Sequence, residues 1–254
     1  MTNTELVGLI ILFLLTSVVG VVTGSNSLIT VPAMFQFGID EKTAIATNMF
    51  GLTFMAIGGT IPFIRQGKIE PRRLSPLIIV TLVGSALGAL LVGYITNQSI
   101  KLIVSIAMFV VVAFTILKPN HEAADGEEGW AGSYWKRPLG VAVTFLLAIY
   151  GGLYSGGYVT ILTASFVAFL GMSYAGSVGA TKLVNVFSSG IATLVFMWQR
   201  LVDYRLGAIL AVTMFIGAFV GAHYAAKMNE VWLKRIFLAS VVLLAIKTLY
   251  DFSV

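Results

Sequence analysis

The stretch GSNSLITVPAMFQF, residues 24–37, opens with four small or polar residues and continues as a short apolar segment. Its apolar part, 28–37, would form a helix of only about 15 Å, whereas the hydrocarbon core of a membrane is about 30 Å thick. A second stretch, SGGYVTILTASFVAFL at 155–170, has the same layout, and its apolar segment 158–171 would span about 21 Å. Short, glycine-interrupted segments at matching places in two halves of a chain are typical of the broken helices around a transporter's midplane site. The alternative is a pair of ordinary loops between tilted full-length helices.

The composition indicates that both stretches belong to a membrane protein. The chain has 254 residues, of which 58% are hydrophobic and 11% charged, whereas a soluble domain carries about 25% charged residues. The sequence therefore predicts an all-α polytopic protein of the lipid bilayer, because runs of about twenty apolar residues can cross it as helices. The net charge of +5 comes mainly from short loops, where basic residues set the orientation in the membrane, so nucleic acid is not an expected partner.

The apolar segments form two sets of five. The first set is 5–24, 28–37, 43–64, 75–94 and 99–117, and the second is 138–155, 158–171, 175–198, 205–226 and 231–250. A polar stretch separates the two sets. We therefore predict a first transmembrane repeat at 1–117, a polar linker at 118–137 and a second transmembrane repeat at 138–254, each repeat with four to five transmembrane segments.

Matching residues in the two halves support an internal duplication of the chain with an offset near 133 residues. Ala46-Thr47-Asn48 corresponds to Ala180-Thr181-Lys182, and GSALGA (84–89) corresponds to GAFVGA (217–222). The glycines and alanines of the latter pair favour close approach of helices. Five crossings in each half would make the halves inverted, and four would make them parallel; we favour inversion, because the short segments then count as elements.

Lys182 is the basic residue that lies clearly inside a predicted span, and no Asp or Glu lies in the interior of one. A lysine at the centre of a bilayer costs about 2.5–3.5 kcal/mol unless it faces a cavity or an anion. Lys182, Asn185 and Ser189 share one helical face by their spacing. This polar stripe with one cation predicts an anion-binding role; the alternative is that the lysine snorkels to the surface.

Several further residues are candidates for contact with the same substrate. The predicted substrate-binding set is Lys182, Thr181, Asn185, Asn48, Thr47, Asn26, Ser25, Ser27, Gly156 and Gly157. Thr47 and Asn48 would bind a ligand or, equally, tie helices together. Backbone N–H groups at the start of the 28–37 helix would favour an anion through the helix dipole. Asp40 and Ser173 are predicted N-caps. The chain has no cysteine and no metal-binding spacing, so we expect no metal and no cofactor.

The order of these features resembles the sulfite exporter TauE/SafE family, also called the TSUP family of membrane permeases. The resemblance is carried by GVVTGSNSLITVPAMFQFGIDEKTAIATNMFG (20–51) and by YGGLYSGGYVTILTASFVAFLGMSYAGSVGATKLVNVFSSG (150–190). Family members usually carry a run of glycines before the proline of the first half, where this chain has Ser25-Asn26-Ser27. In the second half the run is shortened to Gly156-Gly157. The resemblance implies export of small anions, often sulfur-containing, across a bacterial or archaeal inner membrane.

The leading hypothesis is therefore a secondary transporter of small anions, with the substrate bound between the halves and alternating access by their rocking. An anion channel is an alternative. An intramembrane serine protease using Ser155 and His223 is disfavoured, because Leu153 occupies the place where such a site needs glycine, and no enzymatic activity is expected. A homo-oligomer is left open.

Overall fold

The computed structural model describes residues 3–24, 26–65, 71–104, 106 and 136–225. Most of these residues are helical, and no strand occurs among them. The first half contains α1 (Asn3–Thr23), α2 (Ser27–Gln36), α3 (Glu41–Arg65), a 3₁₀ turn η1 (Pro71–Leu74) and α4 (Ser75–Tyr94). The second half contains α6 (Lys136–Leu153), α7 (Tyr158–Leu170), α8 (Tyr174–Trp198) and α9 (Tyr204–Ala225).

The expected membrane architecture is confirmed by the lengths of these helices. Five stretches are long and apolar enough to cross a membrane: Thr4–Val21, Glu41–Arg65, Pro71–Tyr94, Gly176–Trp198 and Tyr204–Tyr224. Ser27–Gln36 and Tyr158–Leu170 are shorter apolar helices, as the sequence predicts. Pro138–Leu153 is also shorter than these five stretches, although 138–155 is not predicted as a short segment. Residues 97–104 are also helical. The remainder of the predicted segment 99–117, most of the linker 118–137 and the segment 231–250 lie outside the described residues, so the repeat boundaries stay predictions.

Both predicted breaks interrupt the helices where the small residues lie. Gly24 follows the last residue of α1 with φ +73°, and the second break holds two residues with positive φ, Ser155 (+70°) and Gly157 (+75°). Positive φ favours glycine because a Cβ collides with the backbone there. Each break therefore reverses the chain and starts a new short helix, α2 or α7.

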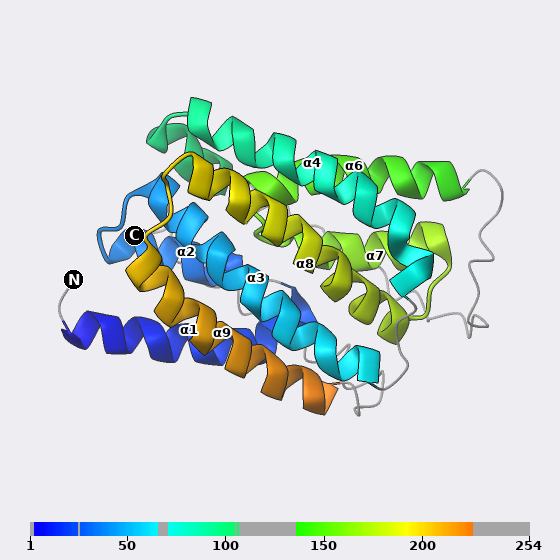
Figure 1. Cartoon of the computed structure of the whole chain (residues 1–254), viewed down its shortest axis with the longest axis horizontal. Helices are drawn as coiled ribbons and strands as arrows, with labels where there is room; N and C mark the ends of the chain where they lie inside the picture. The colour runs from blue at the N-terminus through cyan, green and yellow to red at the C-terminus, as the bar shows by residue number, and fades with distance from the viewer. Residues whose placement is uncertain (1–2, 25, 66–70, 105, 107–135, 226–254) are drawn as a thin grey trace.

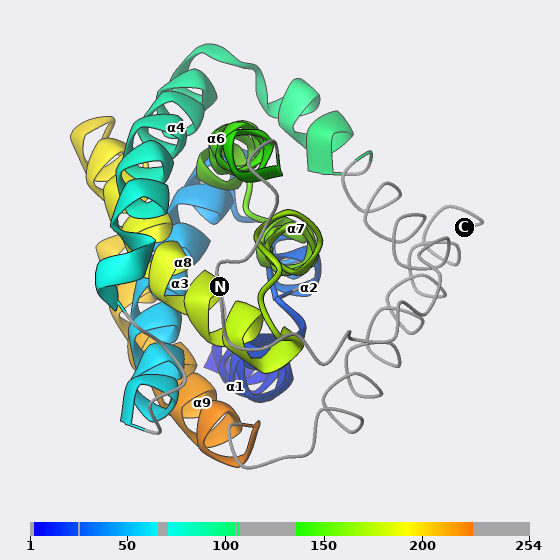
Figure 2. The ribbon, with the colours of Figure 1, turned by 90° about the vertical axis from the view of Figure 1, so that its right-hand side faces the viewer.

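The helices run along the molecule in two opposite directions (Figure 1). α1, α3 and α9 run from left to right in that view, whereas α4, α6 and α8 run from right to left. The short α2 and α7 occupy the left and right parts of Figure 1, and they overlap when the molecule is viewed along its length (Figure 2). The two short helices therefore follow one another along the length of the bundle, between α1 and α6 (Figure 2).

Small residues bring one long helix of each half against the first helix of the other half. α9 packs along α1, and α4 packs along α6. A Cβ on Gly221 would overlap the carbonyl oxygen of Val18, and a Cβ on Gly88 would overlap that of Ile149. The close approach predicted for GSALGA and GAFVGA is confirmed. The contact of α9 with α1 corresponds to the contact of α4 with α6, as a duplication would require. The duplication itself stays a prediction.

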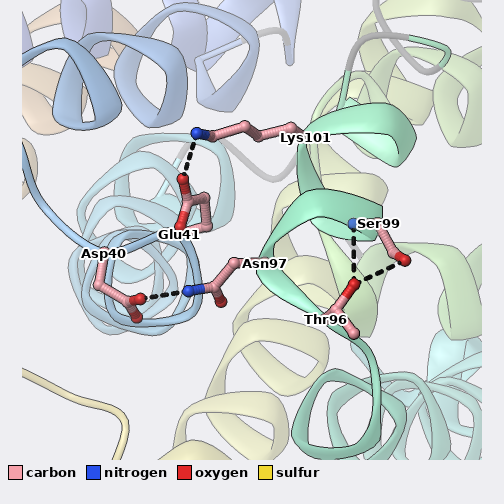
Figure 3. Close-up of polar contacts among 6 residues, drawn as sticks. All are labelled: Asp40, Glu41, Thr96, Asn97, Ser99 and Lys101. Carbon is pink, nitrogen blue, oxygen red and sulfur yellow. Dashed lines mark hydrogen bonds and ion pairs between the residues drawn. The ribbon is translucent and has the colours of Figure 1, made fainter.

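A polar cluster, which we call the α3-end cluster, joins the start of α3 to the chain that follows α4 (Figure 3). Asp40 Oδ2 accepts a hydrogen bond from the backbone N–H of Thr43 (3.2 Å), which confirms the predicted N-cap. Asn97 Nδ2 donates to Asp40 Oδ1 (2.5 Å), and Lys101 Nζ lies 2.7 Å from Glu41 Oε1. Two connections that are distant in sequence are thus held together at one end of the bundle.

Candidate functional site

A small cavity lies where the two breaks meet the long helices α3 and α8. Its volume is about 20 Å³, and its lining is Gly20, Val21, Gly24, Asn26, Ser27, Leu52, Met55, Ala56, Ser155, Val159, Lys182 and Asn185. Both halves of the chain contribute. A space of this size holds about one water molecule, so a larger ligand enters only if the surrounding helices move apart.

Direct contacts fix the two breaks to one another. A Cβ on Gly24 would lie 2.8 Å from the backbone nitrogen of Thr160, in the first turn of α7. The hydroxyl of Tyr154 donates a hydrogen bond to the carbonyl oxygen of Ser27 (3.2 Å), the first residue of α2. The hydroxyl of Tyr150 donates to the carbonyl oxygen of Gly156 within the second break. The starts of α2 and α7 are therefore held side by side at the cavity.

Lys182 reaches this cavity from α8. Its side chain is 3% exposed and passes Gly59 of α3, where a Cβ would lie 3.9 Å from Lys182 Cδ. Among the described residues, none forms a hydrogen bond or an ion pair with its ammonium group. A snorkelling lysine would expose its ammonium, so this burial favours the anion-binding alternative. A buried charge without a partner is costly, and an anion in the cavity would offset that cost.

Two asparagines lie beside the lysine in the cavity lining. Asn26, just before α2, is 4% exposed, and Asn185, on α8, is 6% exposed. Asn26 Nδ2 donates a weak hydrogen bond to Met55 Sδ (3.4 Å). The amide oxygen of each asparagine is buried and accepts no hydrogen bond from the described residues. The cavity thus combines one cation with two amides whose hydrogen bonding is incomplete.

Asn48 and Thr47 lie outside the cavity lining and bind other parts of the chain. Asn48 Oδ1 accepts from Thr30 Oγ1 (2.8 Å), and its Nδ2 donates to Ser27 Oγ (3.0 Å). Asn48 therefore links α3 to α2 by hydrogen bonds, one of them to Ser27 of the cavity lining. Thr47 Oγ1 accepts from the backbone N–H of Asp203 (3.0 Å), at the start of α9.

The remaining candidates fall into three groups. Thr181 is buried and lies 3.1 Å from Thr163, hydroxyl to hydroxyl, outside the cavity lining. Gly156 and Gly157 shape the second break. Ser25 lies outside the described residues. For all ten candidates, a role in substrate binding stays a prediction; four of them, Lys182, Asn185, Asn26 and Ser27, line the cavity.

The cavity also contains residues that sequence reasoning did not assign to substrate binding. Ser155 precedes Gly156-Gly157 directly, and its position in a glycine-containing break was the available signal. Met55 and Val159 carry no polar signal, and only the three-dimensional packing brings them to the cavity. His223 lies in the last turn of α9, outside this lining, so Ser155 and His223 do not meet there.

A helical bundle of membrane-spanning length, with two interrupted helices around a small cavity, is typical of membrane transporters. The family model described as "Sulfite exporter TauE/SafE" matches residues 9–248. The chain belongs to the TauE/SafE family; it is a multi-pass transporter of the inner membrane and not an enzyme.

Similar bacterial proteins carry transporter names. The chain is 25% identical to "Probable membrane transporter protein ORF9" of Sinorhizobium sp, over 91% of this chain and 87% of that protein. It is 25% identical to "Probable membrane transporter protein YfcA" of Escherichia coli K12, over 91% and 84%. It is 26% identical to "Probable membrane transporter protein YdhB" of Bacillus subtilis, over 89% and 92%. No solved structure matches the chain significantly.

Proposed function

We propose that this protein exports small anions, foremost sulfur-containing ones, by alternating access, and that the cavity at Lys182 is the substrate site. The observation that carries the proposal is the buried ammonium group of Lys182, which has no partner among the described residues and faces a cavity between two helix starts. An anion is the ligand that neutralises such a site.

The helix starts add to the positive potential of the lysine. A helix N-terminus carries roughly half a positive charge and presents N–H groups without helical partners. Ser27 is the first residue of α2 and Val159 the second of α7, and both line the cavity. A bound monoanion would therefore meet one full and two partial positive charges.

The proposals that the substrate contains sulfur and that transport is outward rest on the family description. That description names a sulfite exporter, whereas the names of the relatives state a membrane transporter and no substrate. The size of the cavity supports small substrates, because even a limited separation of the helices would admit an oxyanion but not a larger metabolite.

Alternating access requires the cavity to open to each side in turn. The opposite directions of α1 and α6, and of α3 and α8, support two inverted repeats that rock against one another (Figure 1). In the present conformation the cavity has room for about one water molecule (about 20 Å³), which supports a state that is too narrow to hold the substrate. A channel would instead need a continuous path, so saturable transport and counterflow exchange are expected.

The test compares Lys182→Gln, Lys182→Arg and Lys42→Gln, the last of which alters an amine bonded to the carbonyl oxygen of Gly93 (3.1 Å) far from the cavity. Purified proteins are titrated with sulfite, sulfoacetate, thiosulfate and chloride, and ligand stabilisation against heat is measured. Lys182→Gln should weaken binding of the preferred anion at least about tenfold, Lys182→Arg should retain part of it, and Lys42→Gln should bind as wild type. Unchanged binding by Lys182→Gln would contradict the proposal.

A further inference from the structure

Two buried hydrogen-bond acceptors in the cavity lining constrain what the cavity can bind. The amide oxygens of Asn26 and Asn185 are buried and accept no hydrogen bond from any described residue, and both residues line the cavity beside Lys182. Buried polar atoms in native proteins are nearly always paired, and leaving one unpaired is unfavourable. Eight buried side-chain atoms among the described residues lack a partner, and two of them belong to side chains that line this one small cavity, which points to a donor that binds there.

Exchanging the positions of the oxygen and nitrogen of the Asn26 amide would still leave its oxygen without a hydrogen-bond donor. The nitrogen of that amide faces Met55 Sδ at 3.4 Å. A thioether sulfur is an acceptor and has no hydrogen to donate, so the exchanged oxygen would face sulfur and still lack a donor. For Asn185, no described residue forms a hydrogen bond with either end of the amide, and the ammonium of Lys182 does not pair with it.

A water molecule that occupied the cavity in the absence of substrate would supply such a donor. The cavity has room for about one water molecule (about 20 Å³), and water donates two hydrogen bonds. A substrate that enters displaces this water. Displacement is unfavourable when the ligand cannot reproduce the hydrogen bonds that the water made.

We infer that the transported anion carries its own N–H or O–H donor, which satisfies the amide oxygens of Asn26 and Asn185 while its negative charge pairs with Lys182. This inference rests on the proposed function. The class contains protonated oxyanions and amino- or hydroxy-substituted sulfonates. It excludes, as good substrates, anions of the same size and charge that carry acceptors alone.

The discrimination should be large, because a site that hydrogen-bonds its ligand rejects an analogue that lacks the group. The rejected analogue leaves buried acceptors unpaired, and one unpaired acceptor corresponds to roughly a tenfold loss of affinity. Charge alone would give no such preference.

The test uses two monoanions of similar shape, sulfamate and methanesulfonate, which differ by an NH₂ group in place of a CH₃ group. Dissociation constants are measured with the purified wild-type protein at pH 7. Sulfamate should bind at least about tenfold more tightly than methanesulfonate. The comparison needs no variant, so it stands even if substitutions at the cavity fail to fold.

Three variants then locate the preference. Asn26→Leu and Asn185→Leu remove one acceptor each and keep the number and branching of the side-chain heavy atoms, and each should reduce the ratio of the two dissociation constants severalfold. Asn97→Leu is the matched control, because Asn97 also has a buried amide oxygen without a described partner but lies in the α3-end cluster, outside the cavity lining (Figure 3). It should leave the ratio unchanged.

The outcomes separate this inference from the proposed function. Equal affinities, or tighter binding of methanesulfonate, overturn the inference; if both anions still require Lys182, the proposed anion site stands. Binding of both anions that is unaffected by Lys182→Gln overturns the proposed function, and with it the inference. Both are also overturned if neither anion binds while an uncharged small molecule does.

Discussion

Gly24 is a residue of the cavity lining at which the first half of the chain closely approaches the second half. Its φ of +73° and its contact with α7 both depend on the absence of a side chain, since a Cβ would lie 2.8 Å from Thr160 N and 2.9 Å from Val159 Cβ. Gly38, between α2 and α3, has nearly the same φ, +75°, but no atom within 4 Å of the place of its Cβ. Both glycines have a left-handed backbone, but only Gly24 is in close contact with other atoms. Comparing substitutions at the two positions therefore distinguishes the cost of the backbone conformation from the cost of the close contact.

Gly24→Ala should destabilise the protein more than Gly38→Ala. Both substitutions place an alanine in the left-handed region, at a cost of about 1–2 kcal/mol. Gly24→Ala adds overpacking between the breaks, which typically costs about 1–3 kcal/mol. The midpoint of thermal unfolding of the purified proteins measures the difference, and equal midpoints would show that the contact with α7 contributes nothing.

The sequence identifies polar residues inside spans, but it does not tell which of them face the cavity. Lys182 and Asn185 line it, whereas Asn48 and Thr181, which are equally polar and equally buried, have their hydrogen bonds elsewhere. A helix that is apolar on all sides has no hydrophobic stripe from which its orientation can be read. The direction of each polar residue therefore emerges only when the helices pack.

At the scale of elements, the short helices were predictable almost to the residue. The predicted segments 28–37 and 158–171 correspond to α2 (Ser27–Gln36) and α7 (Tyr158–Leu170). Their ends depend on local residues, because glycine and small polar side chains stop a helix wherever they stand. The contact between the two breaks depends on residues more than 130 positions apart, for example Gly24 and Thr160, and no local signal encodes it.

The two long helices that follow α2 and α7 begin differently. α3 is preceded and started by Asp40, Glu41 and Lys42, whereas the corresponding residues of α8 are Ser173, Tyr174 and Ala175, without a charge. The charged residues make the α3-end cluster, with Glu41 paired to Lys101 and Asp40 to Asn97. If the cavity opens at this end during transport, these contacts have to break.

Glu41→Lys should favour opening at the end where α3 begins, because it replaces an ion pair by two like charges. Ser27→Cys provides the readout: the chain has no cysteine of its own, so the added thiol at the cavity is unique. We expect faster reaction of this thiol with a maleimide in the Glu41→Lys background, by up to roughly fivefold, given that exposed ion pairs contribute about 0.2–1 kcal/mol.

The reversed pair Glu41→Lys with Lys101→Glu is the control for this effect. It restores the ion pair with exchanged signs and should return the labelling rate towards that of the parent. Labelling at the parent rate in the single variant would mean that the α3-end cluster has no part in opening.

At the scale of the whole molecule, the distribution of charge predicts an orientation in the membrane. Arg65 ends α3, and Arg72 and Arg73 lie in η1 directly before α4. α6 begins with Lys136 and Arg137 at the same end of the bundle (Figure 1). Basic residues concentrate in cytoplasmic loops, so this end should face the cytoplasm and the starts of α1, α3 and α9 should face outward.

Single cysteines test both this orientation and the proposed inversion of the halves. Thr4→Cys lies in the first turn of α1, Tyr204→Cys at the start of α9, and Leu139→Cys in the first turn of α6; Tyr204 and Leu139 are 55% and 51% exposed. A maleimide that cannot cross the membrane should label Thr4→Cys and Tyr204→Cys in intact cells, and Leu139→Cys only after the membrane is opened. Labelling of only Leu139→Cys from outside would reverse the orientation and keep the inversion. Labelling of Thr4→Cys and Leu139→Cys from the same side would contradict inversion itself, because helices that start the two halves of an inverted pair must enter the membrane from opposite faces.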